Sequence, residues 1–123
     1  MLSSLILQHF QHPLHRGRLD DYHGEGWAGS QGRYLRIQVR LVDNKIDQAR
    51  FETQNCVPAV ACGSALTEWA LGKSLQELPT MDAPTLESLL GGLPEDRRDC
   101  AYLAIHALKR AVEDALQSER RPS

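Results

Sequence analysis

Residues 50–69 read RFETQNCVPAVACGSALTEW, and the rest of the chain can be placed around this stretch. It begins as a strand and continues with small and apolar residues at helical spacing. Pro58 suits the first turn of a helix, where its missing N–H group is not needed, and Gly72 is a stop signal. The stretch therefore predicts a strand that leads into a helix over 58–71, with Cys56 at the junction.

Cys56 lies where a helix N-terminus offers unpaired N–H groups and the positive end of the helix dipole. Both favour the thiolate, which is the form of cysteine that binds metal ions or attacks sulfur. The alternative interpretation is a buried cysteine that acts only as a small apolar residue. Position alone leaves both interpretations open.

Residues 34–53, upstream of this helix, show the alternation of an antiparallel hairpin, with a turn at 43–45. The apolar positions of its first strand are Leu35, Ile37, Val39 and Leu41. A single hairpin is not stable alone. We therefore expect helices to cover its apolar face and residues 22–29 to add a third strand.

The remaining segments predict further helices around this sheet. Residues 1–12 have helical spacing and end before Pro13, and 83–90 form a short helix that ends at a glycine pair. The longest helix starts at Cys100 and has an alanine-rich stripe that permits close packing, and we expect residues 117–123 to fray. The predicted fold is α/β (α+β), a small three-stranded antiparallel sheet covered on one face by helices, in a single domain over 1–123.

Composition and charge exclude several classes of function. The chain has 123 residues, a net charge of −2 and three cysteines. These values give no electrostatic case for nucleic acid or an anionic membrane, and the low, odd cysteine count favours a reducing cytoplasm over a secreted disulfide framework. No apolar run approaches the roughly 18 residues of a membrane span. There is no catalytic triad, no paired-carboxylate site and no nucleotide loop, so we do not expect an enzyme.

Histidines are concentrated near the glycine-rich segment 13–32, but they fit no standard metal-ligand spacing. These residues are His9, His12, His15 and His23. We expect a solvated loop with incidental histidines there. His106 lies off the apolar stripe of the last helix and is expected on the surface.

Cys56 and Cys100 are 44 positions apart, yet each lies where a loop enters a helix. If the two helices pack side by side with their N-termini at one end of the sheet, the two thiols meet there and Asp99 stands beside Cys100. Two cysteines and a carboxylate are a plausible site for zinc or iron. Cys62 lies about 240° further round the first helix, at 100° per residue, and is expected in the core.

Three segments resemble the IscU/NifU N-terminal type of iron–sulfur cluster assembly scaffold. They are 9–19 (HFQHPLHRGRL), 46–75 with Cys56 at its centre, and 93–104 (LPEDRRDCAYLA). The resemblance covers nearly the whole chain. It implies an α/β sandwich on which transient [2Fe–2S] clusters are assembled from iron and from sulfur that a cysteine desulfurase delivers as persulfide. The other partners it implies are a frataxin-like protein and recipient apo-proteins, with the chain itself a monomer or weak homodimer.

The resemblance also implies a set of ligands, of which this chain keeps a part. Cys56 matches the family's second cysteine and Cys100 its third, and Asp99 takes the place of a histidine. An ungapped alignment puts Gly29 at the first cysteine and Gln31 at an aspartate, and Ser30 takes the cysteine's place after a shift of one residue. The candidate site is therefore Cys56, Cys100 and Asp99, with the fourth position left to water, a partner protein or a small thiol.

Three hypotheses of function follow from these residues. The first is a scaffold or carrier for an iron–sulfur cluster or iron with an altered ligand set. The second is a degenerate paralogue that docks on or regulates the assembly machinery without holding a cluster. The third is a protein whose physiological ion is zinc. Anaerobic reconstitution with iron and sulfide separates them.

Overall fold

A three-stranded antiparallel sheet forms the centre of the computed structural model, which describes residues 2–30, 32–54 and 56–120. β1 (Gly24–Ser30), β2 (Arg33–Val42) and β3 (Lys45–Thr53) are neighbours in chain order. The predicted hairpin and third strand are both confirmed. The turn between β2 and β3 has positive φ at Asp43 and Asn44, 54° and 61°, which is the two-residue turn whose twist suits a hairpin.

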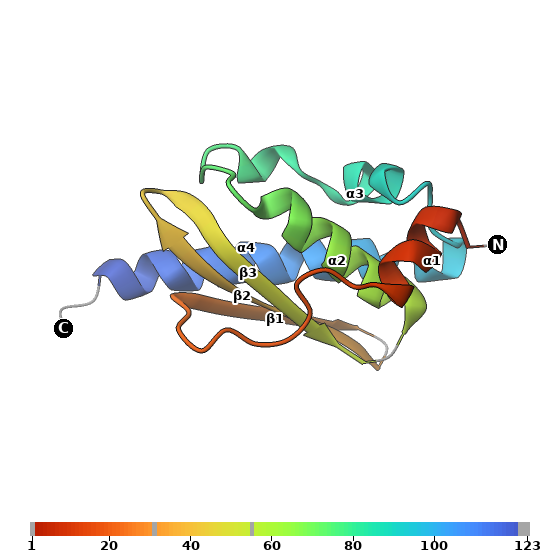
Figure 1. The fold of residues 1–123 in the computed structure, drawn as a ribbon, viewed down its shortest axis with the longest axis horizontal. Coiled ribbons are helices and arrows are strands. Elements are labelled where there is room, and N and C mark those ends of the chain that lie inside the picture. Colours follow the sequence, from red (N-terminus) through yellow and green to blue (C-terminus); the bar gives the residue numbers. More distant parts are fainter. Residues whose placement is uncertain (1, 31, 55, 121–123) are drawn as a thin grey trace.

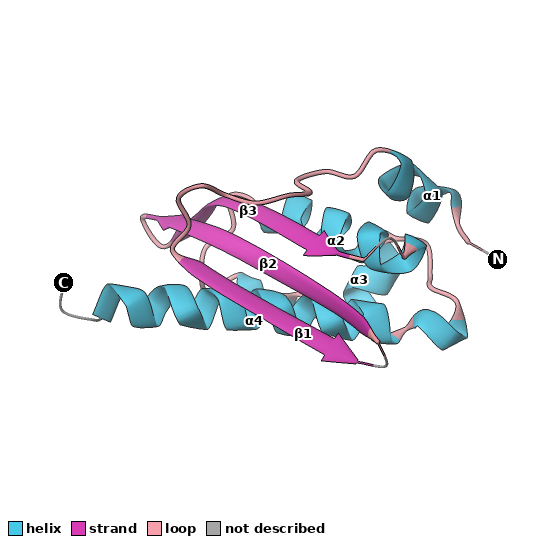
Figure 2. Ribbon diagram, turned by 90° about the horizontal axis from the view of Figure 1, so that it is seen from below, coloured by secondary structure: helices cyan, strands magenta, loops and turns pink. Residues whose placement is uncertain are grey.

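In the part of the chain that the structure describes, four α-helices accompany the sheet: α1 (Ser4–Gln11), α2 (Val57–Ala70), α3 (Ala83–Leu89) and α4 (Asp99–Arg120). Two short 3-10 helices, Leu78–Thr80 and Glu95–Arg97, precede α3 and α4. α2 and α4 lie on the same face of the sheet (Figures 1 and 2), so the predicted α+β architecture is confirmed. α4 continues to Arg120, and the polar residues of this last stretch are adequate helix formers that need no burial. That residues 117–123 fray stays a prediction. Residues 121–123 lie outside the described residues.

α4 packs directly on the backbone of β1. A Cβ atom at Gly24 would lie 2.0 Å from the Ala111 carbonyl oxygen, and one at Gly26 would lie 2.3 Å from the Ala111 nitrogen. Neither position therefore accepts a side chain unless the helix moves. The predicted alanine stripe supplies the other side of this contact, since Ala104, Ala107, Ala111 and Ala115 are all buried.

The opposite face of the sheet is partly covered by the segment that joins α1 to β1. The Leu19 amide donates a hydrogen bond of 2.8 Å to Oε1 of Gln38, and Gln38 is only 4% exposed. Strand alternation alone placed Gln38 on a solvated face, so this burial is a departure from the expected pattern.

Three of the four clustered histidines fix α1 and this segment to the body of the protein, which corrects the expectation that they are incidental. Nδ1 of His9 lies 2.7 Å from the Ser64 hydroxyl on α2, and Nε2 of His15 lies 2.6 Å from a Glu68 carboxylate oxygen. Nδ1 of His23 accepts from the Leu41 amide at 2.9 Å. His12 and His106 are exposed, the latter as predicted.

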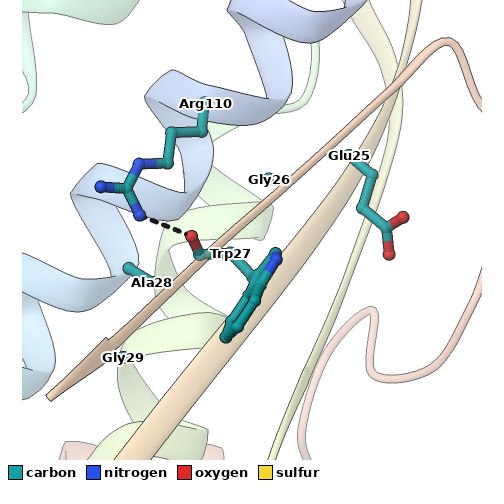
Figure 3. A pocket seen from close by; sticks show the side chains of 6 residues that line it. All are labelled: Glu25, Gly26, Trp27, Ala28, Gly29 and Arg110. Atoms are coloured by element: carbon teal, nitrogen blue, oxygen red, sulfur yellow. Dashed lines mark hydrogen bonds between the residues drawn. The ribbon is translucent and has the colours of Figure 1, made fainter.

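Both outer edges of the sheet are covered. On β3, the Phe51 amide donates to the His15 carbonyl and the Phe51 carbonyl accepts from Gly17, while Ile46 pairs in the same way with Gly72 and Lys73. On β1, the edge is met by two α4 side chains. Arg110 donates to the Trp27 carbonyl at 2.7 Å (Figure 3) and Asp114 accepts from the Glu25 amide at 2.9 Å.

Candidate functional site

Cys56 is the residue that precedes the first turn of α2, as the sequence predicts. Its backbone is extended, Pro58 lies in the first turn, and no side chain caps the helix start. The Cys56 carbonyl accepts the first helical hydrogen bond, from Val60 at 2.9 Å. The half-buried thiol therefore stands beside the free N–H groups of a helix start.

Cys100 is the second residue of α4 and is fully buried. Burial raises the pKa of its thiol to about 12, and the negative charges of Asp99 and Cys56 contribute to the rise, while Arg33 and Arg97 oppose it. The two thiols are thus near each other in the fold, although 44 residues separate them. The starts of α2 and α4 lie at the same end of the molecule (Figure 1).

The Asp99 carboxylate forms an ion pair with Arg33. Nε of Arg33 donates to Oδ2 and Nη2 donates to Oδ1 of Asp99, both at 3.1 Å. Burial alone would lower the pKa of Arg33, but the hydrogen bonds and the charge of Asp99 outweigh it, and the pKa is raised. The charges of Cys100 and Cys56 act on Arg33 in the same direction.

The predicted ligands are thus neighbours but do not form a ready metal site. Over residues 2–30, 32–54 and 56–120, no three side chains of His, Cys, Asp or Glu form a group that could hold a metal ion. Cys62 is fully buried, and burial raises the pKa of its thiol well above the usual range. Its packing in the core agrees with the prediction, and the assignment of Cys56, Cys100 and Asp99 as ligands stays a prediction.

The positions aligned with the family's first cysteine lie at the end of β1. Gly29 pairs with Tyr34 and Ser30 pairs with Arg33, while Gln31 lies outside the described residues. Gly29 does not have a positive φ, and a Cβ there would meet only the Arg33 carbonyl oxygen, at 3.3 Å. The backbone at this corner therefore does not demand glycine.

Arg33 is the site residue that sequence reasoning missed. It is 66 positions from Asp99, and only the turn between β1 and β2 brings it to the start of α4. The local signal is its position directly after Gly32, at the start of the alternating strand. This position does not predict which residue Arg33 pairs with.

Several shallow hollows flank β1, and two of them bear on the site. One is lined by residues 25–29 and Arg110 (Figure 3), and holds none of the three cysteines. The other, about 370 Å³, lies between the end of β1 and α4 and reaches Asp99. The carboxylate of the candidate site is therefore open to solvent on one side, while the buried thiol of Cys100 is not. No helix of the described ranges is both long and apolar enough to cross a bilayer.

Comparison with known proteins identifies the family. The family described as NifU-like N terminal domain matches residues 1–121. The iron-sulfur cluster assembly scaffold protein IscU 1 of Archaeoglobus fulgidus is 35% identical over 116 residues, covering 93% of this chain and 76% of that protein. The IscU scaffold protein of Escherichia coli K12 is 32% identical over 118 residues and 91% of both chains.

A solved structure of similar fold is the N-terminal part of a nitrogen-fixing NifU-like protein from Brucella abortus. It has a TM-score of 0.76 with 94% of each chain covered and 16% sequence identity, so this likeness concerns the fold alone. The family match and the two IscU relatives span nearly all of the residues that build the sheet, the covering helices and both helix-start cysteines. This chain belongs to the NifU-like N-terminal domain family.

Proposed function

We propose that this chain is an iron–sulfur cluster assembly scaffold or carrier, with its cargo held at the starts of α2 and α4. The family match over 1–121 and the names of the IscU relatives support the role. The observation that supports the location is that Cys56 precedes α2, that Cys100 lies in the first turn of α4, and that the starts of these two helices lie at the same end of the molecule (Figure 1). The cluster is cargo in this proposal, so the chain needs no catalytic group of its own.

Each of the three residues has a distinct part in this proposal. Cys56 is the accessible thiol and receives the incoming iron or sulfur first. Cys100 is buried with a raised pKa, so its thiol releases a proton as it binds, and cargo affinity rises with pH. Asp99 offers a carboxylate oxygen once it is free of Arg33. A reducing compartment, the cytoplasm, keeps both thiols available.

Three protein ligands leave one coordination position of a [2Fe–2S] cluster unfilled, because such clusters take four ligands. We propose that the remaining position is filled by a second copy of the chain, a recipient apo-protein or a small thiol, which makes the cargo easy to hand over. A cysteine desulfurase, whose work a frataxin-like protein can assist, is the proposed sulfur source. Zinc fits two thiolates and a carboxylate as well and is the ion to expect in protein isolated in air.

The test is anaerobic reconstitution with iron and sulfide, followed by absorption spectra and metal analysis. Wild type should gain a thiolate-to-iron absorption band, and Cys56→Ser and Cys100→Ser should each lose it. Cys62→Ala is the matched control, because it also removes one buried cysteine but should retain the band. A wild type that folds and takes up neither iron nor sulfide would favour the docking or regulatory paralogue. Uptake of zinc alone would favour a zinc protein.

A further inference from the structure

Both oxygens of the Asp99 carboxylate are occupied by one guanidinium. Arg33 donates to Oδ2 through Nε and to Oδ1 through Nη2, each at 3.1 Å. The side chains are 15% and 26% exposed for Arg33 and Asp99, so this is a partly desolvated, two-point contact, which is the strong form of an ion pair. It ties the start of β2 to the start of α4.

The paired carboxylate belongs to the residue directly before Cys100 at the start of α4. A metal ion held by Cys56, Cys100 and Asp99 would place its positive charge against this same carboxylate. Arg33 already supplies a positive charge there.

We propose that Arg33 is an internal cation that holds the cargo site closed and competes with metal for Asp99. The location of the site rests on the proposed function. Arg33 has to leave Asp99 before that carboxylate can ligate.

This competition makes Arg33 a determinant of ion choice. A hard cation such as Mg²⁺ gains mainly from carboxylate oxygens, and the ion pair denies it both oxygens of Asp99. A thiophilic ion gains from two thiolates in addition, and that gain offsets the loss of the ion pair. In this proposal the site therefore rejects oxygen-seeking ions and admits iron or zinc.

The test measures Co²⁺ affinity in anaerobic, thiol-reduced protein, using the absorption of thiolate-bound Co²⁺ as the readout. Arg33→Gln should bind Co²⁺ about tenfold more tightly than wild type, because one competing charge is removed at contact distance. The matched control is Arg36→Gln. Arg36 lies on the same strand, its side chain is 19% exposed, and it pairs with Glu25 and Glu52 instead. Its affinity should stay within about threefold of wild type, because a distant surface charge is screened.

A second pair of variants tests whether the gain passes through the carboxylate. Adding Asp99→Asn to Arg33→Gln should abolish the gain. Arg33→Lys, which keeps the charge but not the two-point contact, should give a smaller gain and serves as the informative variant if Arg33→Gln does not fold. No gain in a folded Arg33 variant, or an equal gain in Arg36→Gln, overturns the proposal.

The outcome separates this proposal from the proposed function. If wild type assembles a cluster and Arg33→Gln binds Co²⁺ no better, the internal-cation role is wrong and the scaffold role stands. If wild type assembles no cluster while Arg33→Gln gains Co²⁺ affinity, the internal-cation role stands and the scaffold role falls.

Discussion

The three cysteines occupy three different environments within two helices. Cys56 is half-buried at the start of α2, Cys100 is buried one residue inside α4, and Cys62 is buried in the middle of α2. Burial raises the pKa of Cys100 and Cys62, so both stay protonated at neutral pH. Identical side chains should therefore differ widely in reactivity.

Brief treatment with iodoacetamide at pH 7 should label Cys56 far faster than Cys62. The thiolate is the nucleophile, and Cys56 is half-buried, whereas Cys62 is fully buried and its pKa is raised by that burial. Mass spectrometry of peptides reports the order. Cys56→Ser should leave only slow labelling that follows global unfolding, and preferential labelling of Cys62 would contradict the assignment.

His9 should make stability depend on pH. Burial lowers its pKa, against a smaller opposing effect of Glu68, so the folded protein binds fewer protons at this site than the unfolded chain. Its contribution is present above pH 6.5 and is lost as the pH falls through the lowered folded value. Urea unfolding at pH 7.5 and 5.0 should show a larger loss for wild type than for His9→Asn, which retains an acceptor for Ser64 but does not titrate. Equal losses would mean that His9 is not a source of the pH dependence.

Prediction from sequence succeeds at this scale where the cause is local. Pro58 and the small residues after it identify the start of α2 and hence the place of Cys56. The sequence does not predict the partner of Asp99, because Arg33 lies 66 residues away in the chain and only the fold brings the two side chains together. The hydrogen bonds of the clustered histidines were missed for the same reason.

Among the secondary-structure elements, the close contact of α4 with β1 depends on the absence of side chains at two positions of the strand. Gly24 and Gly26 leave no side chain between the strand and the helix backbone, and buried alanines line the helix face. Alternating strands and an alanine stripe are visible in the sequence, and they were enough to predict a sheet covered by helices. The sequence does not predict which strand lies under α4, because that choice depends on the close approach of two backbones.

Gly26→Ala should destabilise the protein strongly. Its new Cβ would lie 2.3 Å from the Ala111 nitrogen and 2.4 Å from the Ala107 carbonyl oxygen, so the helix has to shift. We expect a loss of about 3 kcal/mol, at the upper end for overpacking, and a fall in Tm of about 10 °C. Gly29→Ala, on the same strand, should change stability by less than about 1 kcal/mol. Similar melting curves for the two variants would contradict this packing.

At the scale of the whole molecule, the proposed site offers three ligands from one copy of the chain to a cluster that takes four. The candidate site lies at one end of the molecule and is open on the side of Asp99. Two copies can therefore approach end to end without disturbing either sheet. This arrangement favours assembly around the cargo over assembly through an apolar interface.

Cluster-loaded protein reconstituted without small thiols should elute as a dimer with about one cluster per two chains, while the apo-protein elutes as a monomer. Excess glutathione should shift the loaded protein toward the monomer by supplying the missing ligand. Size-exclusion chromatography with light scattering and iron analysis measures both. A loaded monomer in the absence of added thiol would require a fourth ligand from the chain itself.

The α4 residues that cover the β1 edge of the sheet are synthesised after all three strands. All three strands have left the ribosome once residue 53 is free, but Arg110 and Asp114, which meet the β1 edge, come some 60 residues later. At about 5–20 residues per second, a nascent sheet waits on the order of 3–12 s with that edge bare. During this interval β1 can pair with a strand of a neighbouring nascent chain. Slow codons between the strands and α4 would lengthen the exposure and lower the yield of folded protein.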